Sequence, residues 1–231
     1  MKKHRLLTRL ASVALTGLVA VPASAAIVPN GGFESPDIAS WTLKSPGDTG
    51  ITGWTVVGNT ISFQDSAAFG GLGVVASEGS QFLELTGIVG RGGGVRSDPF
   101  STVNGTNYRL QFDIGAFFVA GQGSYGDVIV DLWIDGVARG SFTNLIGLSG
   151  PGSDWETETF DFIAAGATTT LEFRSSLSTA SSDLGVGLDN IRMTELAAVS
   201  SPLQGLPEPT SALLLAAGLT GLGGIRRFAR R

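Results

Sequence analysis

Hydrophobic and polar residues alternate with a period of two along much of the chain. Tyr108, Leu110, Phe112 and Ile114 fall on one face of an extended segment, and the polar residues between them fall on the other. This pattern is typical of antiparallel strands with one buried face. The same alternation predicts further strands around residues 61–63, 81–85, 128–134, 159–162, 170–173 and 188–193.

Glycine-rich turns separate these predicted strands. Asp135-Gly136 lies between two apolar runs, and this pair favours a type I′ hairpin because both central residues need a positive φ. Between residues 27 and 196, no segment has a helical period over ten or more residues, and a turn near 65–69 is the one candidate for helical structure. We therefore expect one all-β domain over residues 27–196, a two-sheet antiparallel jelly-roll sandwich.

The first 26 residues have the pattern of a secretory signal peptide. Lys2, Lys3 and Arg5 precede an apolar run over residues 10–21, and the small residues Ala23-Ser24-Ala25 follow it. We therefore exclude residues 1–26 from the fold and expect the body to be exported. Residues 197–205, with Ser, Pro and Gly, form a short linker after the last predicted strand.

Two missing residue types exclude many kinds of site in the body. The chain has no cysteine, and its one histidine, His4, lies in the predicted signal peptide. A disulfide scaffold, a Cys or His nucleophile system, a Ser-His-Asp triad and a Cys/His zinc site are therefore excluded.

The charge of the body limits its partners. Of the 15 Lys and Arg residues, four lie in residues 1–26 and four in residues 206–231, which leaves 7. Of the 20 Asp and Glu residues only Glu208 is removed, which leaves 19 and a formal charge of 7 minus 19, or -12, for residues 27–205. Nucleic acid is therefore not an expected partner, whereas cations, neutral glycans and proteins are compatible with this charge.

The C-terminal segment predicts a membrane span. Residues 210–225 carry no charge, and as a helix they would extend about 24 Å, against a hydrocarbon core of about 30 Å. The basic tail over residues 226–231 follows, and by the positive-inside rule it would stay in the cytoplasm. Its arginines are Arg226, Arg227, Arg230 and Arg231.

Residues 206–231 also resemble a known sorting signal. Pro207-Glu208-Pro209, an apolar span and a terminal arginine cluster are together similar to the PEP-CTERM signal of Gram-negative bacteria. The resemblance implies that an exosortase recognises the tail and cuts it near the Pro-Glu-Pro motif. Membrane attachment would then be transient, and the product would reach the cell envelope or extracellular matrix. The alternative is a permanent tail anchor.

The two ends of the body carry a second resemblance. The segment Asn30-Gly31-Gly32-Phe33-Glu34, the pair Gly53-Trp54 and the segment Leu188-Asp189-Asn190-Ile191 resemble galactose-binding-like jelly rolls, which include carbohydrate-binding modules. The resemblance implies a structural calcium ion held by Glu34 and Asp189, with carbonyl groups near Asn30 and Gly32. The alternative is that both acids only cap strands through hydrogen bonds, and no cofactor is required for function.

Aromatic residues in or near predicted loops are the candidates for glycan binding, because sugar rings stack on flat side chains. These candidates are Trp41, Phe117, Phe118, Tyr125 and Trp155.

No set of residues in the sequence predicts catalysis. Asp127, Asp131 and Asp135 recur at steps of four, but they alternate with apolar residues and so belong to the solvated face of a strand. We therefore expect a non-enzymatic envelope or matrix protein that binds extracellular polysaccharide. One alternative is a polysaccharide hydrolase, which needs two facing carboxyl groups in a cleft bordered by aromatic residues. The other is a structural adhesin without a small ligand.

Overall fold

Each segment that the alternation predicts as a strand overlaps a strand of the structure, a computed structural model. The structure describes residues 25–26, 28–87, 92–118, 128–145, 152–176 and 185–197. All of them belong to one compact unit, Met1–Ala197.

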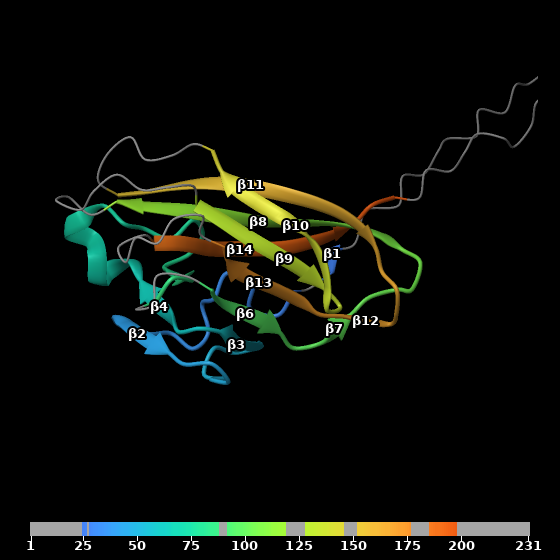
Figure 1. The fold of residues 1–231 in the computed structure, drawn as a ribbon, viewed down its shortest axis with the longest axis horizontal. Coiled ribbons are helices and arrows are strands. Elements are labelled where there is room, and N and C mark those ends of the chain that lie inside the picture. Colours follow the sequence, from blue (N-terminus) through green and yellow to red (C-terminus); the bar gives the residue numbers. More distant parts are fainter. Residues whose placement is uncertain are drawn as a thin grey trace, which may run out of the picture. The chain divides into compact units, whose positions relative to one another are not determined.

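A seven-stranded antiparallel sheet forms the larger layer of this unit (Figure 1). Its central strand β14 (Gly185–Glu195) pairs with β8 on one side and with β5 on the other. The short strand β1 (Ala25–Ala26) also pairs with β14. The strands along the sheet are β11 (Gly152–Ile163), β8 (Asn107–Phe118), β14, β5 (Gln81–Glu84), β4 (Ile61–Asp65) and β2 (Trp41–Lys44).

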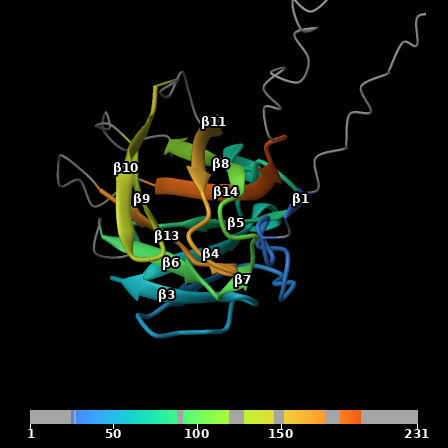
Figure 2. The ribbon, with the colours of Figure 1, turned by 90° about the vertical axis from the view of Figure 1, so that its right-hand side faces the viewer.

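A five-stranded antiparallel sheet forms the second layer, and Figure 2 shows the strands of both sheets in a view turned by 90° from Figure 1. Its strands are, in order, β10 (Val137–Asn144), β9 (Val128–Ile134), β13 (Leu171–Ser175), β6 (Gly93–Ser97) and β3 (Trp54–Gly58). A two-stranded sheet, β7 (Phe100–Ser101) with β12 (Thr168–Thr169), completes the fold. The prediction of an all-β sandwich with two antiparallel sheets is therefore confirmed.

The core lies between the two sheets. Leu110, Phe112 and Ile114 of β8 are fully buried, as the period-two pattern predicts for one face of a strand. Phe112 meets Phe173 of the smaller sheet with ring centroids 5.0 Å apart. Trp54 is also buried, and its indole N–H donates to the carbonyl oxygen of Pro29 at 3.0 Å.

Local turn chemistry agrees with the sequence at two positions. Asp135 and Gly136 both have positive φ, 53° and 75°, and they connect β9 to β10 as a hairpin. The turn predicted near 65–69 is the 3₁₀ helix η1 (Ser66–Leu72), whose N-cap Asp65 accepts a hydrogen bond from the Ala67 N–H at 2.6 Å.

Several predictions concern residues outside this description. The sorting motif, the predicted span over 210–225 and the basic tail all lie outside the described residues, as do residues 1–24. Among the described residues, no helix is long and apolar enough to cross a membrane. Ala25 and Ala26, the last two residues of the predicted signal peptide, form β1.

Candidate functional site

The larger sheet has a second face, which we call the outer face, on the side away from the core. Two rows of side chains cross it, because residues paired in neighbouring strands share a face. Each row takes one residue from each of the strands β5, β14, β8 and β11, in that order. The upper row consists of Glu84, Gly187, Gly115 and Trp155. The lower row consists of Phe82, Asp189, Asp113 and Thr157.

Residues 73–80 lie across the outer face, and we call them the covering segment. The Val75 N–H donates to Ser153 Oγ at 3.0 Å, and the Val75 carbonyl oxygen accepts from the Trp155 indole N–H at 2.9 Å. Val74 and Ala76 pack against Phe82 and Trp155 in a small second hydrophobic cluster, which also includes Phe69 of η1. The outer face therefore has its own buried interior, separate from the main core.

Asp113 and Asp189 form the polar part of this interior. The two aspartates are register partners in β8 and β14, and their residues are 3% and 0% exposed. Asp189 accepts hydrogen bonds from the backbone N–H groups of Ser77 and Glu78, both at 2.9 Å. Asp113 accepts a hydrogen bond from the Ser77 hydroxyl group.

Two further side chains contact Asp113. The Thr157 hydroxyl group donates to it at 2.6 Å, and the Asn190 amide donates at 2.8 Å. Asn190 has a positive φ of 53° and lies where the β8–β14 register shifts, so an irregularity in β14 turns its side chain toward Asp113.

Burial controls the protonation of Asp189. It raises the pKa of this carboxyl group to about 8, although three backbone N–H donors, from Glu78, Asn190 and Ser77, act in the opposite direction. The nearby Glu78 carboxylate raises this pKa further. Asp189 is therefore a carboxylic acid that keeps its proton at neutral pH.

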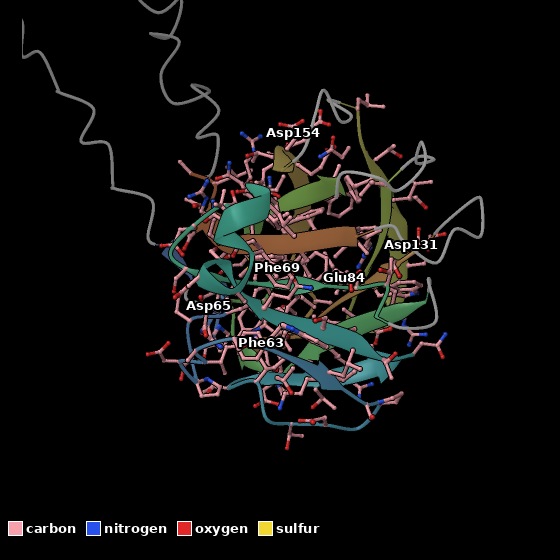
Figure 3. The ribbon with its side chains drawn as sticks, turned by 90° about the vertical axis from the view of Figure 1, so that its left-hand side faces the viewer. Phe63, Asp65, Phe69, Glu84, Asp131 and Asp154 are labelled. Carbon is pink, nitrogen blue, oxygen red and sulfur yellow. The ribbon has the colours of Figure 1, made fainter. Side chains whose placement is uncertain are left out.

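A second buried carboxyl group, Glu84, lies in the upper row. Burial raises the pKa of Glu84 to about 7, and hydrogen bonds from Thr86 and Gly87 oppose the rise. The Thr86 N–H donates at 2.6 Å and the Gly87 N–H at 2.9 Å. Figure 3 labels Glu84 on β5 and Phe69 on the neighbouring 3₁₀ helix.

Aromatic rings lie beside these acids. Phe82 and Trp155 meet edge to face, with ring centroids 5.8 Å apart. Trp155 lies over Gly115, where a Cβ atom would be only 2.7 Å from its ring. Gly115 and its register partner Gly187 leave the strip of sheet between Glu84 and Trp155 without side chains.

The expected calcium ligands are not brought together as a metal site. Glu34 accepts from the N–H and hydroxyl groups of Ser80 and from the Gln81 N–H, at 2.8, 2.9 and 2.8 Å. Asp189 likewise accepts three backbone N–H groups. In the part of the chain that the structure describes, no group of three or more His, Cys, Asp or Glu residues could hold a metal ion. These contacts favour a structural role for the pair, and calcium binding stays a prediction.

The other two expected ligands lie near the same chain end. The Asn30 amide donates to the carbonyl oxygens of Ser35 and Thr52, at 2.7 and 3.0 Å. A Cβ atom at Gly32 would lie 2.3 Å from the Glu78 carboxylate. Asn30 therefore holds the N-terminal loop in place through these hydrogen bonds, and Gly32 lies against the end of the Glu78 side chain.

The glycan candidates do not share one surface loop. Trp41 is 52% exposed in the short strand β2, whereas Trp155 is partly buried in β11. Phe117 and Phe118 end β8, but their side chains are outside the described residues, as is the whole of Tyr125.

The sequence did not single out Asp113 or Glu84. Asp113 follows the ordinary alternation of a half-solvated strand, and Glu84 lies in a run whose outer face gives no sign of being covered. The only sequence signal near the site was Leu188-Asp189-Asn190-Ile191, which led to Asp189 in a different role. Asp131 and Asp135 lie elsewhere, on β9 and its hairpin turn, and accept from Ser141 and from the Thr170 N–H.

Comparison with known proteins identifies the family to which the chain belongs. The model of the HpiC1-like family, described as HpiC1 cyclase, matches residues 24–194. No curated protein matches the chain.

Two solved cyclase structures share the fold at low sequence identity. The Stig cyclase Fisc of Fischerella sp. TAU, in complex with (3Z)-3-(1-methyl-2-pyrrolidinylidene)-3H-indole, has 19% identity and a TM-score of 0.55, over 75% of this chain and 98% of that one. A Fischerella sp. TAU cyclase in complex with 4-(1H-indol-3-yl)butan-2-one has 19% identity and a TM-score of 0.50, with the same coverage. The CBM22-1 xylan-binding domain of Paenibacillus barcinonensis Xyn10C has 13% identity and a TM-score of 0.39, over 78% of this chain and 99% of that one.

The comparisons overturn one expectation. The prediction of a non-enzymatic body is wrong, because the matching family model is that of a cyclase. The aspartates Asp127, Asp131 and Asp135 were expected on a solvated face, whereas Asp113, Asp189 and Glu84 of the outer face are buried.

Proposed function

Because the chain belongs to the HpiC1-like family, we propose that its body is a cyclase in which Asp189 donates the proton that starts ring closure. A cyclisation that only rearranges bonds needs no oxidant or reductant. A proton is added to an unsaturated substrate, an internal π bond attacks the cation that results, and a proton is then lost. Substrate and product have the same mass.

The observation that carries this proposal is the buried pair of Asp113 and Asp189 beneath the covering segment. A carboxylic acid with a pKa near 8 is protonated at neutral pH and is a stronger acid than water, which suits a general acid. Asp113 lies directly across the strand pair from it and accepts hydrogen bonds from Ser77, Thr157 and Asn190. The pair thus places a proton donor beside a second buried carboxyl group.

The aromatic pair supports cationic chemistry at the same place. The faces of Phe and Trp rings attract positive charge, by about 0.5–2 kcal/mol for each contact. Phe82 is in the same row as the two aspartates, and Trp155 is in the next row. A carbocation or iminium ion formed beside Asp189 would therefore lie against aromatic carbon instead of water.

Substrate entry requires the covering segment to move, because Asp189 is fully buried. The segment is attached to the sheet through main-chain atoms of Val75, Ser77 and Glu78 and the hydroxyl of Ser77. Displacing it would expose the acid and the aromatic pair together. We propose that the substrate replaces these contacts and that the segment closes over it during the reaction.

The proposal is tested with small unsaturated indoles, since two of the structurally similar cyclases hold indole compounds. Each compound is incubated with the protein, and an isomeric product of unchanged mass is sought by liquid chromatography with mass spectrometry. We expect the wild type to form such an isomer and Asp189→Asn to lose at least about a hundredfold in rate.

The matched control is Asp161→Asn, which removes an exposed carboxylate of the same sheet and should retain activity. Unchanged turnover by Asp189→Asn would remove Asp189 from the mechanism. The absence of any isomer with the wild type would overturn the indole substrate class.

Glycan binding is a second candidate function, supported by one observation. Trp41 is 52% exposed beside Leu43, which is 39% exposed, on the edge strand β2. Flat aromatic side chains at this exposure suit stacking against sugar rings. Affinity electrophoresis in gels that contain envelope polysaccharide tests it: retardation that disappears in Trp41→Ala supports glycan binding, and unretarded wild type opposes it.

The place of action is proposed from the chain ends. The predicted signal peptide and the Pro207-Glu208-Pro209 motif support export, processing by an exosortase and delivery to the envelope or extracellular matrix of a Gram-negative bacterium.

A further inference from the structure

Two buried hydroxyl groups near Glu84 have no hydrogen-bond partner. They are Thr60 Oγ1 and Ser62 Oγ, and among the buried side-chain nitrogen and oxygen atoms of the described residues they are the ones without a partner. The Ser62 residue is only 4% exposed. A buried hydroxyl group without a partner is unfavourable, so a pair of them points to a polar group that binds here.

Both residues are neighbours of Glu84 on the outer face of the sheet. Ser62 and Glu84 are register partners in β4 and β5, which places their Cβ atoms about 5 Å apart on the outer face. Thr60 lies close to Gly87, which is in the turn that follows Glu84. The Gly87 N–H donates to Glu84 Oε2 at 2.9 Å, and a Cβ atom at Gly87 would lie 2.7 Å from Thr60 Oγ1.

The cluster contains two hydroxyl oxygens and a carboxyl group, Glu84, that becomes negatively charged when it loses its proton. Among the ion pairs of the described part of the chain, none involves Glu84. A buried carboxyl group without a positive partner is costly to ionise, and a cation bound beside it would offset that cost. Two hydroxyl oxygens and one carboxyl group are too few for Ca²⁺, which takes six to eight oxygen ligands. A protonated nitrogen with up to three N–H donors matches three acceptors.

We propose that Glu84, Ser62 and Thr60 form a subsite that binds a protonated nitrogen group, an ammonium or iminium, of the substrate. This inference rests on the proposed cyclase function, because it places the subsite on the same outer face as Asp189. Glu84 and Asp189 lie on the adjacent strands β5 and β14. Gly187, the register partner of Glu84, has no side chain that would separate the two acids. A substrate with its nitrogen at Glu84 would extend over this glycine toward Phe82 and Asp189.

The experiment compares two indoles that differ in one charge. Tryptamine carries a protonated amine at neutral pH, and 3-ethylindole is a neutral compound of similar shape. Isothermal titration calorimetry with the full chain should show tryptamine binding about tenfold more tightly, as a charge-assisted hydrogen bond predicts. The preference should disappear in Glu84→Gln and weaken in Ser62→Ala. It should persist in the control Asp161→Asn.

Each outcome decides the proposal. A tryptamine preference that survives in Glu84→Gln overturns the subsite, as does equal binding of both compounds to the wild type. Circular dichroism melting of Glu84→Gln shows whether that variant is folded. If it is not, the comparison rests on Ser62→Ala, and an undiminished preference in that variant overturns the subsite.

If neither indole binds, the proposed substrate class fails, and the subsite is tested alone. The ¹³C signal of the Glu84 carboxyl group is then followed by NMR with methylammonium chloride. A shift that sodium chloride does not reproduce supports the subsite, and no shift overturns it.

Discussion

Asp113 and Asp189 lie directly opposite each other on β8 and β14, and Ser77 contacts both, with its hydroxyl group on Asp113 and its N–H on Asp189. One residue of the covering segment thus connects two carboxyl groups that come from distant parts of the sequence.

The stability of the wild type should fall as the pH rises toward 8. The pKa of Asp189 increases from 3.8 in the unfolded chain to about 8 in the folded one, so the folded state binds more protons between these values. Unfolding therefore becomes easier as the pH rises through this range. Glu84 acts in the same direction only between 4.5 and about 7.

Asp189 contributes most of the pH dependence between pH 7 and 8. Over this interval the free energy of unfolding should fall by about 1 kcal/mol more in the wild type than in Asp189→Asn, as measured by urea unfolding. The same fall in both proteins would mean that Asp189 does not carry the raised pKa.

Gly115→Ala should displace Trp155. The added Cβ atom would lie 2.7 Å from the indole ring, which cannot shift without breaking its hydrogen bond to Val75. We expect a loss of about 1–3 kcal/mol in unfolding free energy and a red shift in tryptophan fluorescence. Gly71→Ala is the control, because a Cβ atom there meets nothing within 4 Å. An unchanged emission spectrum in Gly115→Ala would contradict this arrangement of the outer face.

Removal of divalent cations should leave the folded body unchanged. The carboxyl groups of Glu34 and Asp189 each accept three hydrogen bonds from the protein, so their structural role needs no ion. Differential scanning calorimetry with excess EGTA should give the same Tm as calcium-containing buffer, within about 1 °C. A higher Tm in calcium would support the calcium site implied by the galactose-binding-like resemblance.

The Ser77→Ala variant should loosen the covering segment. It removes the hydroxyl bond to Asp113 but retains the backbone bond to Asp189, so the expected destabilisation is about 1–2 kcal/mol. Hydrogen exchange of residues 74–78 should become faster, while exchange in β9 and β13 stays unchanged. Uniform acceleration across both sheets would instead indicate that the whole fold is weakened.

Processing of the tail is tested by the intact mass of the protein from its native envelope. Cleavage near Pro207-Glu208-Pro209 predicts loss of the apolar span and of the arginine cluster. A C-terminus that still ends at Arg231 would favour the permanent anchor.

The sequence by itself determined the type of fold, because period-two alternation depends only on neighbouring residues. Leu110, Phe112 and Ile114 were predicted to share the buried face of one strand, and they do. Asp135-Gly136 predicted the β9–β10 hairpin for an equally local reason, since its turn requires positive φ at both residues. The lack of cysteine, and of histidine beyond His4, excluded thiol and imidazole chemistry from the body.

Only the tertiary structure decided where that chemistry lies. Alternation placed Asp113 on the polar face of its strand, but it could not show that residues 73–80 cover that face. The register of β8 with β14 brings Asp113 beside Asp189, and the register of β4 with β5 brings Ser62 beside Glu84. Burial, and with it the raised pKa values of Asp189 and Glu84, arises from contacts between segments far apart in the sequence. A pattern of neighbouring residues cannot predict contacts between distant segments.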